Sequence, residues 1–291
     1  MKCLLCKSDK QSTFAKVASF GYPLVYYQCE NCGFIYQSLE ESQAADPEFY
    51  RETYRKIYQA IEEPTEKDLW VQKKRADHLV EVTQNQLNEF PKRVLDIGAS
   101  TGTLLNQMHQ AFTSEIIGVE PGDAYRTYAQ SVGIEMFPSL DSLIESNSEK
   151  FDLISMSHVL EHLPDPVNEL RKIKTELLEN HGHLLIEVPN FYAHDSYELA
   201  HLSCFTPHTL IEMLGQAGFK VVFIKKHGVP RSEKLNLYIT VLGEPLTTGK
   251  SQIKKDHFVG AKREISMLYR RLMQKLFPHK AWLPISVIDE G

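Results

Sequence analysis

The sequence predicts an α/β fold in which a mostly parallel sheet carries helices on both faces, with a small cysteine-rich segment at the N-terminus. Three observations support this prediction. Apolar strand-like segments alternate with helical segments between residues 91 and 245, which is typical of a doubly wound domain. A turn of small residues, 98–102, joins the first of these strands directly to a helix. Two Cys-x-x-Cys pairs lie within the first 32 residues.

Length and composition limit the classes of protein to consider. A chain of 291 residues, 42% of them hydrophobic, suits one large domain with a small appendage. No apolar run approaches the roughly 20 residues of a membrane-spanning helix, and Met1–Lys7 lacks the apolar stretch of a secretory signal. We therefore expect a cytoplasmic protein. The formal net charge of −6 argues against nucleic acid as a partner, because a surface that coats nucleic acid is basic.

The first element, residues 1–45, is predicted to be a zinc ribbon. Its two cysteine pairs are 22 residues apart, and each pair forms a tight turn that directs two sulfurs at one point. Together they make the closed thiolate cage of a structural zinc ion, with no ligand position left for water. Phe14–Tyr27 suits a hairpin, and Gly33 suits a turn with positive φ. The alternative is four free or redox-active thiols. The predicted zinc ligands are Cys3, Cys6, Cys29 and Cys32.

The second element, residues 46–90, is predicted to be a helical connector and lid. Tyr50, Tyr54 and Tyr58 share one face of a first helix, where they serve either as packing residues or as a lid over a cofactor. A longer helix begins at Pro64-Thr65 and runs to about Leu87.

The third element, residues 91–245, begins with its most informative segment. A strand over Arg93–Ile97 ends in the small-residue turn, and the following helix starts at once, so a ligand can approach the backbone near the positive end of a helix. The second strand, Glu115–Val119, ends in Glu120, 18 residues after Gly102. An acid at this position is suited to accept hydrogen bonds from both hydroxyls of a ribose.

These residues resemble the class I S-adenosylmethionine-dependent methyltransferases, whose first strand ends Asp-x-Gly-x-Gly-x-Gly and whose second strand ends in an acid. Asp96, Gly98, Gly102 and Glu120 match, whereas Ser100 replaces the middle glycine. The resemblance covers about residues 66–243 and implies a Rossmann-like seven-stranded methyltransferase sheet with the last strand antiparallel. It also implies the cofactor contacts Asp96, Gly98, Ala99, Ser100, Gly102, Glu120, Pro121, Ser139, Leu140, Ser157 and His158.

The remaining strands follow in the order of that family. We expect the third to seventh strands at residues 134–137, 151–156, 184–188, 220–224 and 235–242.

After the fourth strand, His158, Glu161 and His162 have a spacing that directs all three toward one pocket if they form a helical turn. The string His-x-x-Glu-His formally matches an inverted zinc-peptidase motif, but Pro164 and Pro166 end the helix too early for it. The segment instead resembles a stretch found in methyltransferases that act on sugars and on ubiquinone precursors. In the latter, acidic and histidine positions can hold a divalent ion, but His158 stands where that group has an acid. The resemblance directs His162 toward the methyl acceptor; the alternative is that His162 only caps or packs the turn.

The loop after the fifth strand contains His201, followed by Thr206 and Pro207, which suit the start of a helix. The block resembles a segment of sugar methyltransferases, some of which also carry a zinc ribbon and have a Glu-His pair here. The acid of that pair is replaced by Ala200. An imidazole can remove a proton from the acceptor near neutral pH, so we predict His201 as the first candidate for the catalytic base and His162 as the second. Cys204 is expected to be a buried small hydrophobe.

The last element, residues 246–291, is predicted to be a basic amphipathic helix and tail. Residues 250–280 hold nine basic and two acidic residues. A helical apolar stripe is formed by Ile265, Leu268, Tyr269, Leu272, Met273 and Leu276. We expect this stripe to dock on the acidic body of the protein; a partner protein and an anionic membrane surface are the alternatives.

The function predicted from these features is S-adenosylmethionine-dependent methylation of a small molecule, with a sugar or nucleotide-sugar hydroxyl or carbon as the leading acceptor. One alternative is an RNA methyltransferase that holds RNA with the ribbon, although residues 1–45 carry no net charge. The other is a non-catalytic interaction module that has kept the fold.

Overall fold

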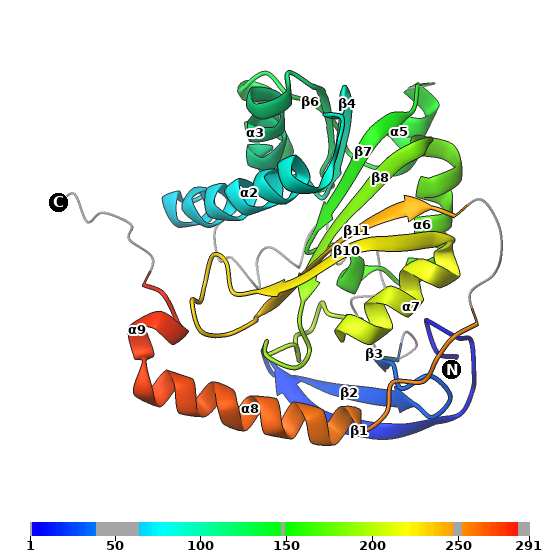
Figure 1. Ribbon diagram of the computed structural model, residues 1–291, viewed down its shortest axis with the longest axis vertical. Coiled ribbons are helices and arrows are strands. Elements are labelled where there is room, and N and C mark those ends of the chain that lie inside the picture. The colour runs from blue at the N-terminus through cyan, green and yellow to red at the C-terminus, as the bar shows by residue number, and fades with distance from the viewer. Residues whose placement is uncertain (1, 39–63, 147–148, 247–251, 285–291) are drawn as a thin grey trace.

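The computed structural model describes residues 2–38, 64–146, 149–246 and 252–284 (Figure 1). A large twisted sheet with helices on both faces fills the upper part of the molecule, and a small sheet lies below it with a long helix along its edge (Figure 1). The predicted helix of Tyr50, Tyr54 and Tyr58 lies outside the described residues.

The large sheet has seven strands in the order β10-β11-β8-β7-β4-β5-β6. Strand β11 is antiparallel to both of its neighbours, β8 and β10, and β8, β7, β4, β5 and β6 are mutually parallel. The predicted seven-stranded sheet with an antiparallel last strand is therefore confirmed. The strands are β4 (Arg93–Ile97), β5 (Glu115–Val119), β6 (Glu135–Phe137), β7 (Phe151–Ser157), β8 (Leu178–Pro189), β10 (Phe219–His227) and β11 (Tyr238–Pro245).

Alternate side chains of these strands enter two separate cores, as a sheet covered on both faces requires. Val94 and Leu153 pack against residues of α2, α3 and α4, whereas Leu95 and Ile154 share the other core with residues of α5, α6 and α7. The helices are α2 (Glu66–Gln86), α3 (Thr103–Phe112), α4 (Asp123–Ser131), α5 (Leu140–Ser146), α6 (Pro166–Lys172) and α7 (Pro207–Ala217).

Two helix starts that the sequence predicts are confirmed together with their caps. The Oγ1 of Thr65 accepts a hydrogen bond from the backbone N–H of Asp68 at 3.2 Å, and the carboxylate of Asp68 accepts from the N–H of Thr65 at 3.1 Å. These reciprocal bonds fix the first turn of α2. The Oγ1 of Thr206 caps α7 in the same way, with Pro207 at the first helical position.

Some boundaries differ from the prediction because tertiary contacts decide them. The fifth strand starts at Leu178 and not at residue 184, directly after a π-helical turn, Ile173–Leu177. The seventh strand starts at Tyr238, because Leu235 and Leu237 pack against Ala281 of α9 (Pro278–Ala281) in a small hydrophobic cluster.

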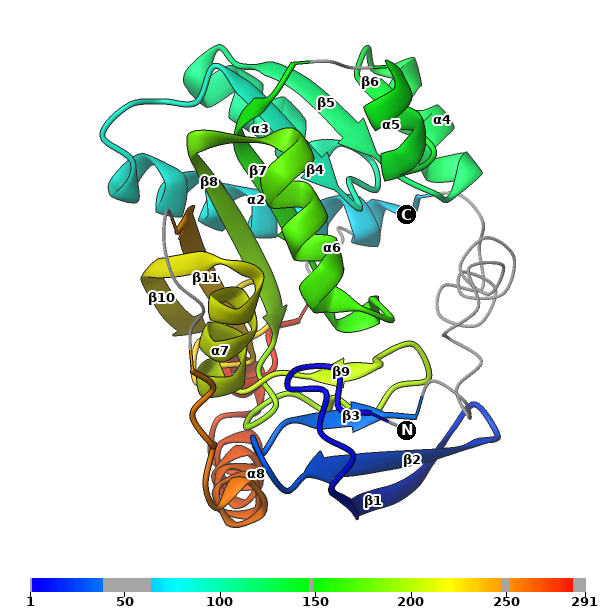
Figure 2. The same ribbon diagram turned by 90° about the vertical axis from the view of Figure 1, so that its right-hand side faces the viewer.

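The small sheet has four strands in the order β1-β2-β3-β9. The predicted hairpin consists of β1 (Gln11–Ser19) and β2 (Tyr22–Cys29), joined by Phe20 and Gly21, both with positive φ. The third strand is β3 (Ile35–Gln37), and it pairs with β9 (Ser203–Cys204), which comes from the loop after β8. The N-terminal ribbon thus shares its sheet with the large domain, as Figure 2 shows.

The C-terminal helix α8 (Val259–Leu276) lies along the small sheet (Figure 1). Its docking was predicted correctly, but the docking face was predicted wrongly. Val259 and Arg263 are its buried residues, while Ile265, Leu268 and Leu272 of the predicted stripe are exposed. The physical reason is that guanidinium groups occupy the inner face, where Arg263 stacks on the ring of Phe191.

Within the described ranges, no helix combines the length and the apolar character that crossing a membrane would require.

Candidate active site and cysteine cluster

A cavity of about 720 Å³ lies at the carboxyl ends of β4, β5 and β7, with α2 as one wall. This is the edge of an open parallel sheet where ligands bind. The cavity lining includes ten of the eleven residues that the sequence predicts as cofactor contacts: Asp96, Gly98, Ala99, Ser100, Glu120, Pro121, Ser139, Leu140, Ser157 and His158.

Gly102, the eleventh residue, does not line the cavity but shapes the turn beside it. It caps the start of α3 with φ at 74°, and a Cβ there would meet Cδ1 of Ile134 at 2.2 Å. Gly98 also has a positive φ, and a Cβ on it would meet Cγ2 of Val159 at 2.3 Å. Both glycines are therefore required by backbone conformation and by close packing.

Ser100 keeps the left-handed conformation of the glycine that it replaces, with φ at 52°. Its Oγ accepts a hydrogen bond from Nε2 of Gln72 on α2 at 3.2 Å, and Thr101 donates to Oε1 of the same side chain. The serine thus ties the turn to the wall of the cavity, a contact that glycine could not make.

Two buried carboxyl groups lie at the floor of the cavity. Glu120 accepts hydrogen bonds from the backbone N–H groups of Ser100 at 3.0 Å and Gly122 at 2.7 Å. Asp96 accepts from the hydroxyl of Ser155 at 2.7 Å. Burial raises the pKa of Asp96 to about 7; the Ser155 hydrogen bond lowers this pKa and the charge of Glu120 raises it.

At the rim, Ser139 and Leu140 lie where α5 begins. The hydroxyls of Ser139 and Ser142 bond each other at 3.2 Å, so this edge of the cavity is fixed by local hydrogen bonds. On the opposite side, Oγ of Ser157 is buried without a hydrogen-bond partner among the described residues.

His158 follows β7 with a left-handed backbone, φ 57°. Its Nδ1 lies 3.4 Å from Oε1 of Glu161, and its Nε2 lies 3.2 Å from Oε1 of Glu187. Burial and the charge of Arg75 lower the pKa of His158, but its bonds to the two carboxylates outweigh them and the pKa is raised. The two carboxylates therefore favour the protonated form of His158 at this side of the cavity.

The three-residue helical turn Leu160–His162 keeps Glu161 close to both His158 and His162, but only the two histidines face the cavity. His158 and His162 line the cavity, whereas Glu161 lies behind them, almost completely buried. The helix α6 then starts at Pro166, so the short turn excludes the long helix of a peptidase motif, as predicted.

His162 and His201 lie in contact, with ring centroids 5.0 Å apart. His162 lines the cavity, and His201 is buried behind it and does not. The Nδ1 of His162 donates to the carbonyl of Ala200 at 2.9 Å, which leaves Nε2 as the acceptor atom. Burial lowers the pKa values of both histidines. Of the two histidines, His162 therefore lies at the cavity surface and His201 lies behind it.

Glu187, in the interior of β8, is a residue that the sequence reasoning missed. Its carboxylate lies 2.7 Å from Nε of Arg75, 3.2 Å from Nε2 of His227 and 3.3 Å from Oγ1 of Thr240, in addition to its bond to His158. The available signal was an acid inside an otherwise apolar strand, Leu184–Val188. This one carboxylate connects α2, β7, β10 and β11 beside the cavity.

Basic side chains from separate elements also line the cavity and were missed, because no motif marks them. Lys172 pairs with Asp141, and Arg75 pairs with Glu187. Arg231, in the turn after β10, has no carboxylate partner in the described part of the chain, and its guanidinium lies 5.8 Å from the ring centroid of Trp282. Burial lowers the pKa of Arg231.

The four N-terminal cysteines form one cluster, as predicted. Their sulfurs all lie within 4.8 Å of one another, with Cys3–Cys32 at 3.6 Å and Cys6–Cys29 at 3.4 Å. A tetrahedral zinc with bonds of about 2.3 Å would separate its sulfurs by about 3.8 Å, so the donor set fits this ion.

The turns that carry these cysteines have the same backbone form. The carbonyl of Cys3 accepts from the N–H of Lys7 at 2.9 Å, and the carbonyl of Cys29 accepts from the N–H of Gly33 at 2.8 Å. Lys7 and Gly33 both have positive φ, as predicted for Gly33. The two turns therefore direct their sulfurs at one point in the same way.

Comparisons with known proteins identify a matching family model and several similar proteins. A family model for the methyltransferase domain matches residues 70–223, just over half of the chain. A ubiquinone biosynthesis O-methyltransferase from Hahella chejuensis is 33% identical over 84 residues, which are 26% of this chain and 35% of that protein. The enzyme of the same name from Aliivibrio fischeri is 28% identical over 116 residues, 38% and 49% of the two chains. The chain thus spans between a third and a half of the length of these curated relatives.

Among solved structures, the 1,6-didemethyltoxoflavin-N1-methyltransferase of Burkholderia thailandensis has a TM-score of 0.48 at 21% identity, covering 62% of this chain and 81% of that one. An S-adenosylmethionine-dependent methyltransferase from Mesorhizobium loti has a TM-score of 0.47 at 16% identity, with coverage of 58% and 99%. From the match of its central residues and the strand order of its sheet, we conclude that the chain belongs to the methyltransferase domain family, with the class I α/β fold.

Proposed function

We propose that this protein transfers the methyl group of S-adenosylmethionine to a small molecule. The observation that supports this most is the carboxylate of Glu120, which lines the cavity at the end of β5 and is held by two backbone N–H groups. A carboxylate at this position can accept the two hydroxyl hydrogens of a ribose. The small-residue turn beside it lets the cofactor approach the backbone.

The proposed cofactor site comprises the ten lining residues named above, with Gly102 shaping the turn. S-adenosylmethionine, when bound, supplies an activated methyl group on its sulfonium. The orphaned Oγ of Ser157 fits such a ligand, because a buried hydroxyl needs a partner and the cavity offers none of its own among the described residues. Holding cofactor and acceptor in line is the main task of the chain.

We propose His162 as the base for a hydroxyl acceptor, with His201 as a positioning residue. Burial lowers the pKa values of both histidines and so favours neutral rings near pH 7. Because Nδ1 of His162 donates to the carbonyl of Ala200, Nε2 is the nitrogen that takes a proton. As the acceptor oxygen takes the methyl group, its proton moves to this Nε2. The ring of His201 packs on His162 and holds its orientation.

The acceptor we propose is a sugar or a nucleotide-linked sugar. Its support is Arg231, a guanidinium in the cavity wall without a carboxylate partner in the described chain. An unpaired, partly buried guanidinium is suited to bind a phosphate with two hydrogen bonds. The RNA alternative would need a ribbon surface open to RNA, whereas β9 of the large domain completes the ribbon sheet and α8 lies along it.

We propose that the cysteine cluster holds a structural zinc ion. We also propose four parts of the chain: a ribbon at 1–45, a helical connector and lid at 46–90, the methyltransferase domain at 91–245 and a basic tail at 246–291. All four sulfurs are needed as ligands, so this metal has no open position for chemistry. Reduced thiols in such pairs suit the cytoplasm.

A methyl-transfer assay with labelled cofactor and a panel of free and nucleotide-linked sugars tests this function. We expect transfer to at least one phosphate-bearing acceptor, slowed about 100-fold or more by His162→Gln, since a general base contributes at least that factor. His181→Gln, which changes an exposed histidine with no contact to the cavity, should leave the rate unchanged. Equal rates for the two variants would remove His162 from the mechanism, and no transfer to any sugar would remove the acceptor class.

A further inference from the structure

The outer face of α8 carries an exposed apolar stripe. Its residues follow the helical repeat, and their exposed fractions are 69% for Ile265, 62% for Leu268, 51% for Tyr269, 49% for Leu272 and 55% for Leu276. Phe258, just before the helix, is 80% exposed. A contiguous apolar surface of this kind on a folded protein marks a binding site.

The orientation of α8 is fixed by contacts on the opposite face, so the stripe cannot turn inward without breaking them. The guanidinium of Arg263 lies 4.1 Å from the ring centroid of Phe191 and 4.6 Å from that of Tyr197. About two turns further along, and therefore on the same face, Arg270 donates to the carbonyl of Ala193 at 2.9 Å. These are desolvated cation–π and hydrogen-bond contacts, and they hold the helix with its apolar side outward.

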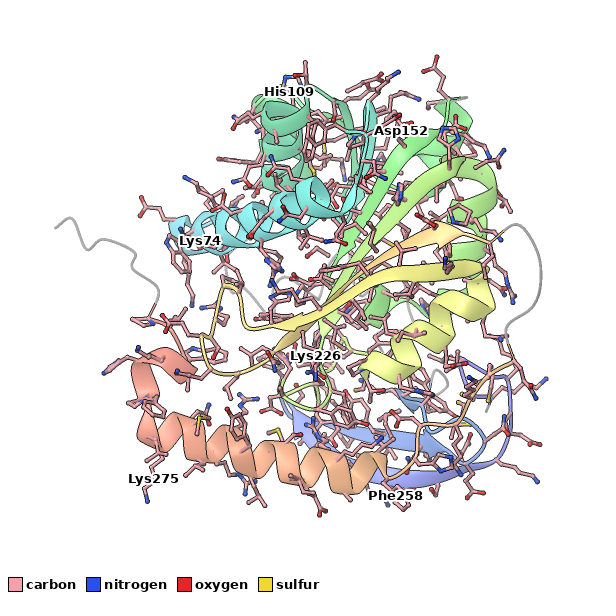
Figure 3. All side chains as sticks on the ribbon, viewed as in Figure 1. Lys74, His109, Asp152, Lys226, Phe258 and Lys275 are labelled. Carbon is pink, nitrogen blue, oxygen red and sulfur yellow. The ribbon has the colours of Figure 1, made fainter. Side chains whose placement is uncertain are left out.

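Exposed cations flank the stripe. At 3.6 residues per turn, Arg271 and Lys275 lie along one edge of the stripe, and both are exposed. Lys262 lies along the other edge, where it pairs with the carboxylate of Asp256 at 2.7 Å. Glu264 is the one acidic residue of the helix. Figure 3 places Phe258 and Lys275 at opposite ends of α8, on the periphery of the molecule.

We propose that the outer face of α8 binds the surface of an anionic phospholipid bilayer. A helix with an apolar stripe between rows of cations lies in the plane of the lipid headgroups, with the stripe among the first acyl carbons. The anionic headgroups then neutralise Arg271 and Lys275.

A second copy of the chain is the less suitable occupant. Packing two α8 stripes together would bring the flanking cations of both copies close to each other, and like charges at such distances repel. The same cations favour an anionic surface, so charge complementarity selects the bilayer.

Co-sedimentation with vesicles tests this proposal and needs no methyl acceptor. The full chain is mixed with vesicles made of equal parts of phosphatidylglycerol and phosphatidylcholine, and with vesicles of phosphatidylcholine alone. We expect binding to the anionic vesicles only, weakened by salt. The variant Leu268→Ser/Leu272→Ser should lower the partition coefficient at least about 10-fold, because two leucines leave the interface.

The matched control is Ile211→Ser/Val222→Ser, which removes two apolar side chains, each 40% exposed, from α7 and β10. This variant should bind vesicles like the unchanged chain, and circular dichroism should show that both variants fold. Absence of vesicle binding, equal loss in both variants, or a dimer in solution that the α8 variant abolishes would each overturn the proposal.

Discussion

At the scale of single residues, the turn after β4 shows how a departure from a family pattern is accommodated. Ser100 adopts a φ of 52° that costs a residue with a Cβ about 1 kcal/mol. Its hydroxyl offsets part of that cost through the hydrogen bond from Gln72 of α2. The sequence shows that Ser100 replaces a glycine of the pattern, but it could not predict this bond, because Gln72 lies 28 residues away.

The two roles of Ser100 can be separated by substitution. Ser100→Ala keeps the strained φ and loses the hydrogen bond, so we expect a loss of about 1 kcal/mol in the free energy of unfolding. Ser100→Gly loses the same bond but relieves the strain, so its stability should stay close to that of the unchanged chain. Urea unfolding measures both. Equal destabilisation by the two variants would show that the left-handed backbone at residue 100 costs no free energy.

Asp96 makes stability depend on pH. Its folded pKa of about 7 lies above the ordinary value of 3.8, so the folded chain binds this proton more tightly than the unfolded chain. The buried carboxylate therefore destabilises the fold increasingly as pH rises from about 4 through 7. Asp96→Asn keeps an oxygen that accepts from Ser155 and removes the charge.

We expect Asp96→Asn to raise the free energy of unfolding more at pH 8 than at pH 5, as urea titrations at the two values would measure. Asp123→Asn, at an exposed site on the surface of α4, is the control and should show no such difference. An equal increase in the free energy of unfolding for Asp96→Asn at both pH values would contradict the raised pKa of Asp96.

The residues that the sequence could and could not predict differ in how they reach the site. Asp96 and Glu120 end adjacent parallel strands, so local pattern and strand order suffice to bring them together. Arg75, Glu187 and Arg231 come from a helix face, a strand interior and a turn, and only tertiary packing directs them to the cavity.

At the scale of elements, the ribbon is tied to the active-site loop. The Nε2 of Gln37, at the end of β3, donates to the carbonyl oxygens of His201 at 2.8 Å and Glu198 at 2.9 Å. Hairpin and cysteine turns have strong local signals and were predicted, whereas the pairing of β3 with the two-residue strand β9 depends on the folded loop and was not. The ribbon that carries the cysteine cluster therefore supports the backbone of His201.

Removal of one cysteine ligand should release the metal. We expect one zinc per chain in the unchanged protein and none in Cys32→Ser, measured by plasma mass spectrometry, with a lower melting temperature for the variant. Cys204→Ser is the matched control, because this buried thiol lies outside the cluster, and it should retain the metal. Zinc retained in Cys32→Ser, or a fully folded chain purified without metal, would contradict the cage.

The helix α8 shows where reasoning from periodicity fails. The amphipathic pattern correctly predicted a helix, and the usual rule assigned its apolar side to the core. The structure reverses the sides, because arginine stems and guanidinium planes can pack on aromatic rings as well as leucines can. Which face of a helix is buried depends on the surface that receives it, and here that surface is aromatic.

At the scale of the whole molecule, the large sheet and α2 form one cavity, and the small sheet lies outside its lining. The carboxyl edge of the large sheet supplies the floor of the cavity, and α2 supplies a wall. The loop that carries His201 joins the large sheet to the ribbon sheet through β9 (Figure 2). Glu187 fixes the wall to the sheet through Arg75. The architecture of the large domain follows from the order of its strands, which the sequence predicted. The shape of the cavity around His162 and Arg231 depends on contacts between distant residues, which no local pattern in the sequence indicates.

Calorimetric titration with S-adenosylmethionine tests the central claim most directly. We predict saturable binding of one cofactor per chain, weakened about 10-fold or more by Glu120→Gln, because hydrogen bonds to a charged group contribute about 1.5–3 kcal/mol. Glu135→Gln, which changes an exposed acid on β6, is the control and should bind like the unchanged chain. No binding to the unchanged protein, or equal affinity in both variants, would contradict the account.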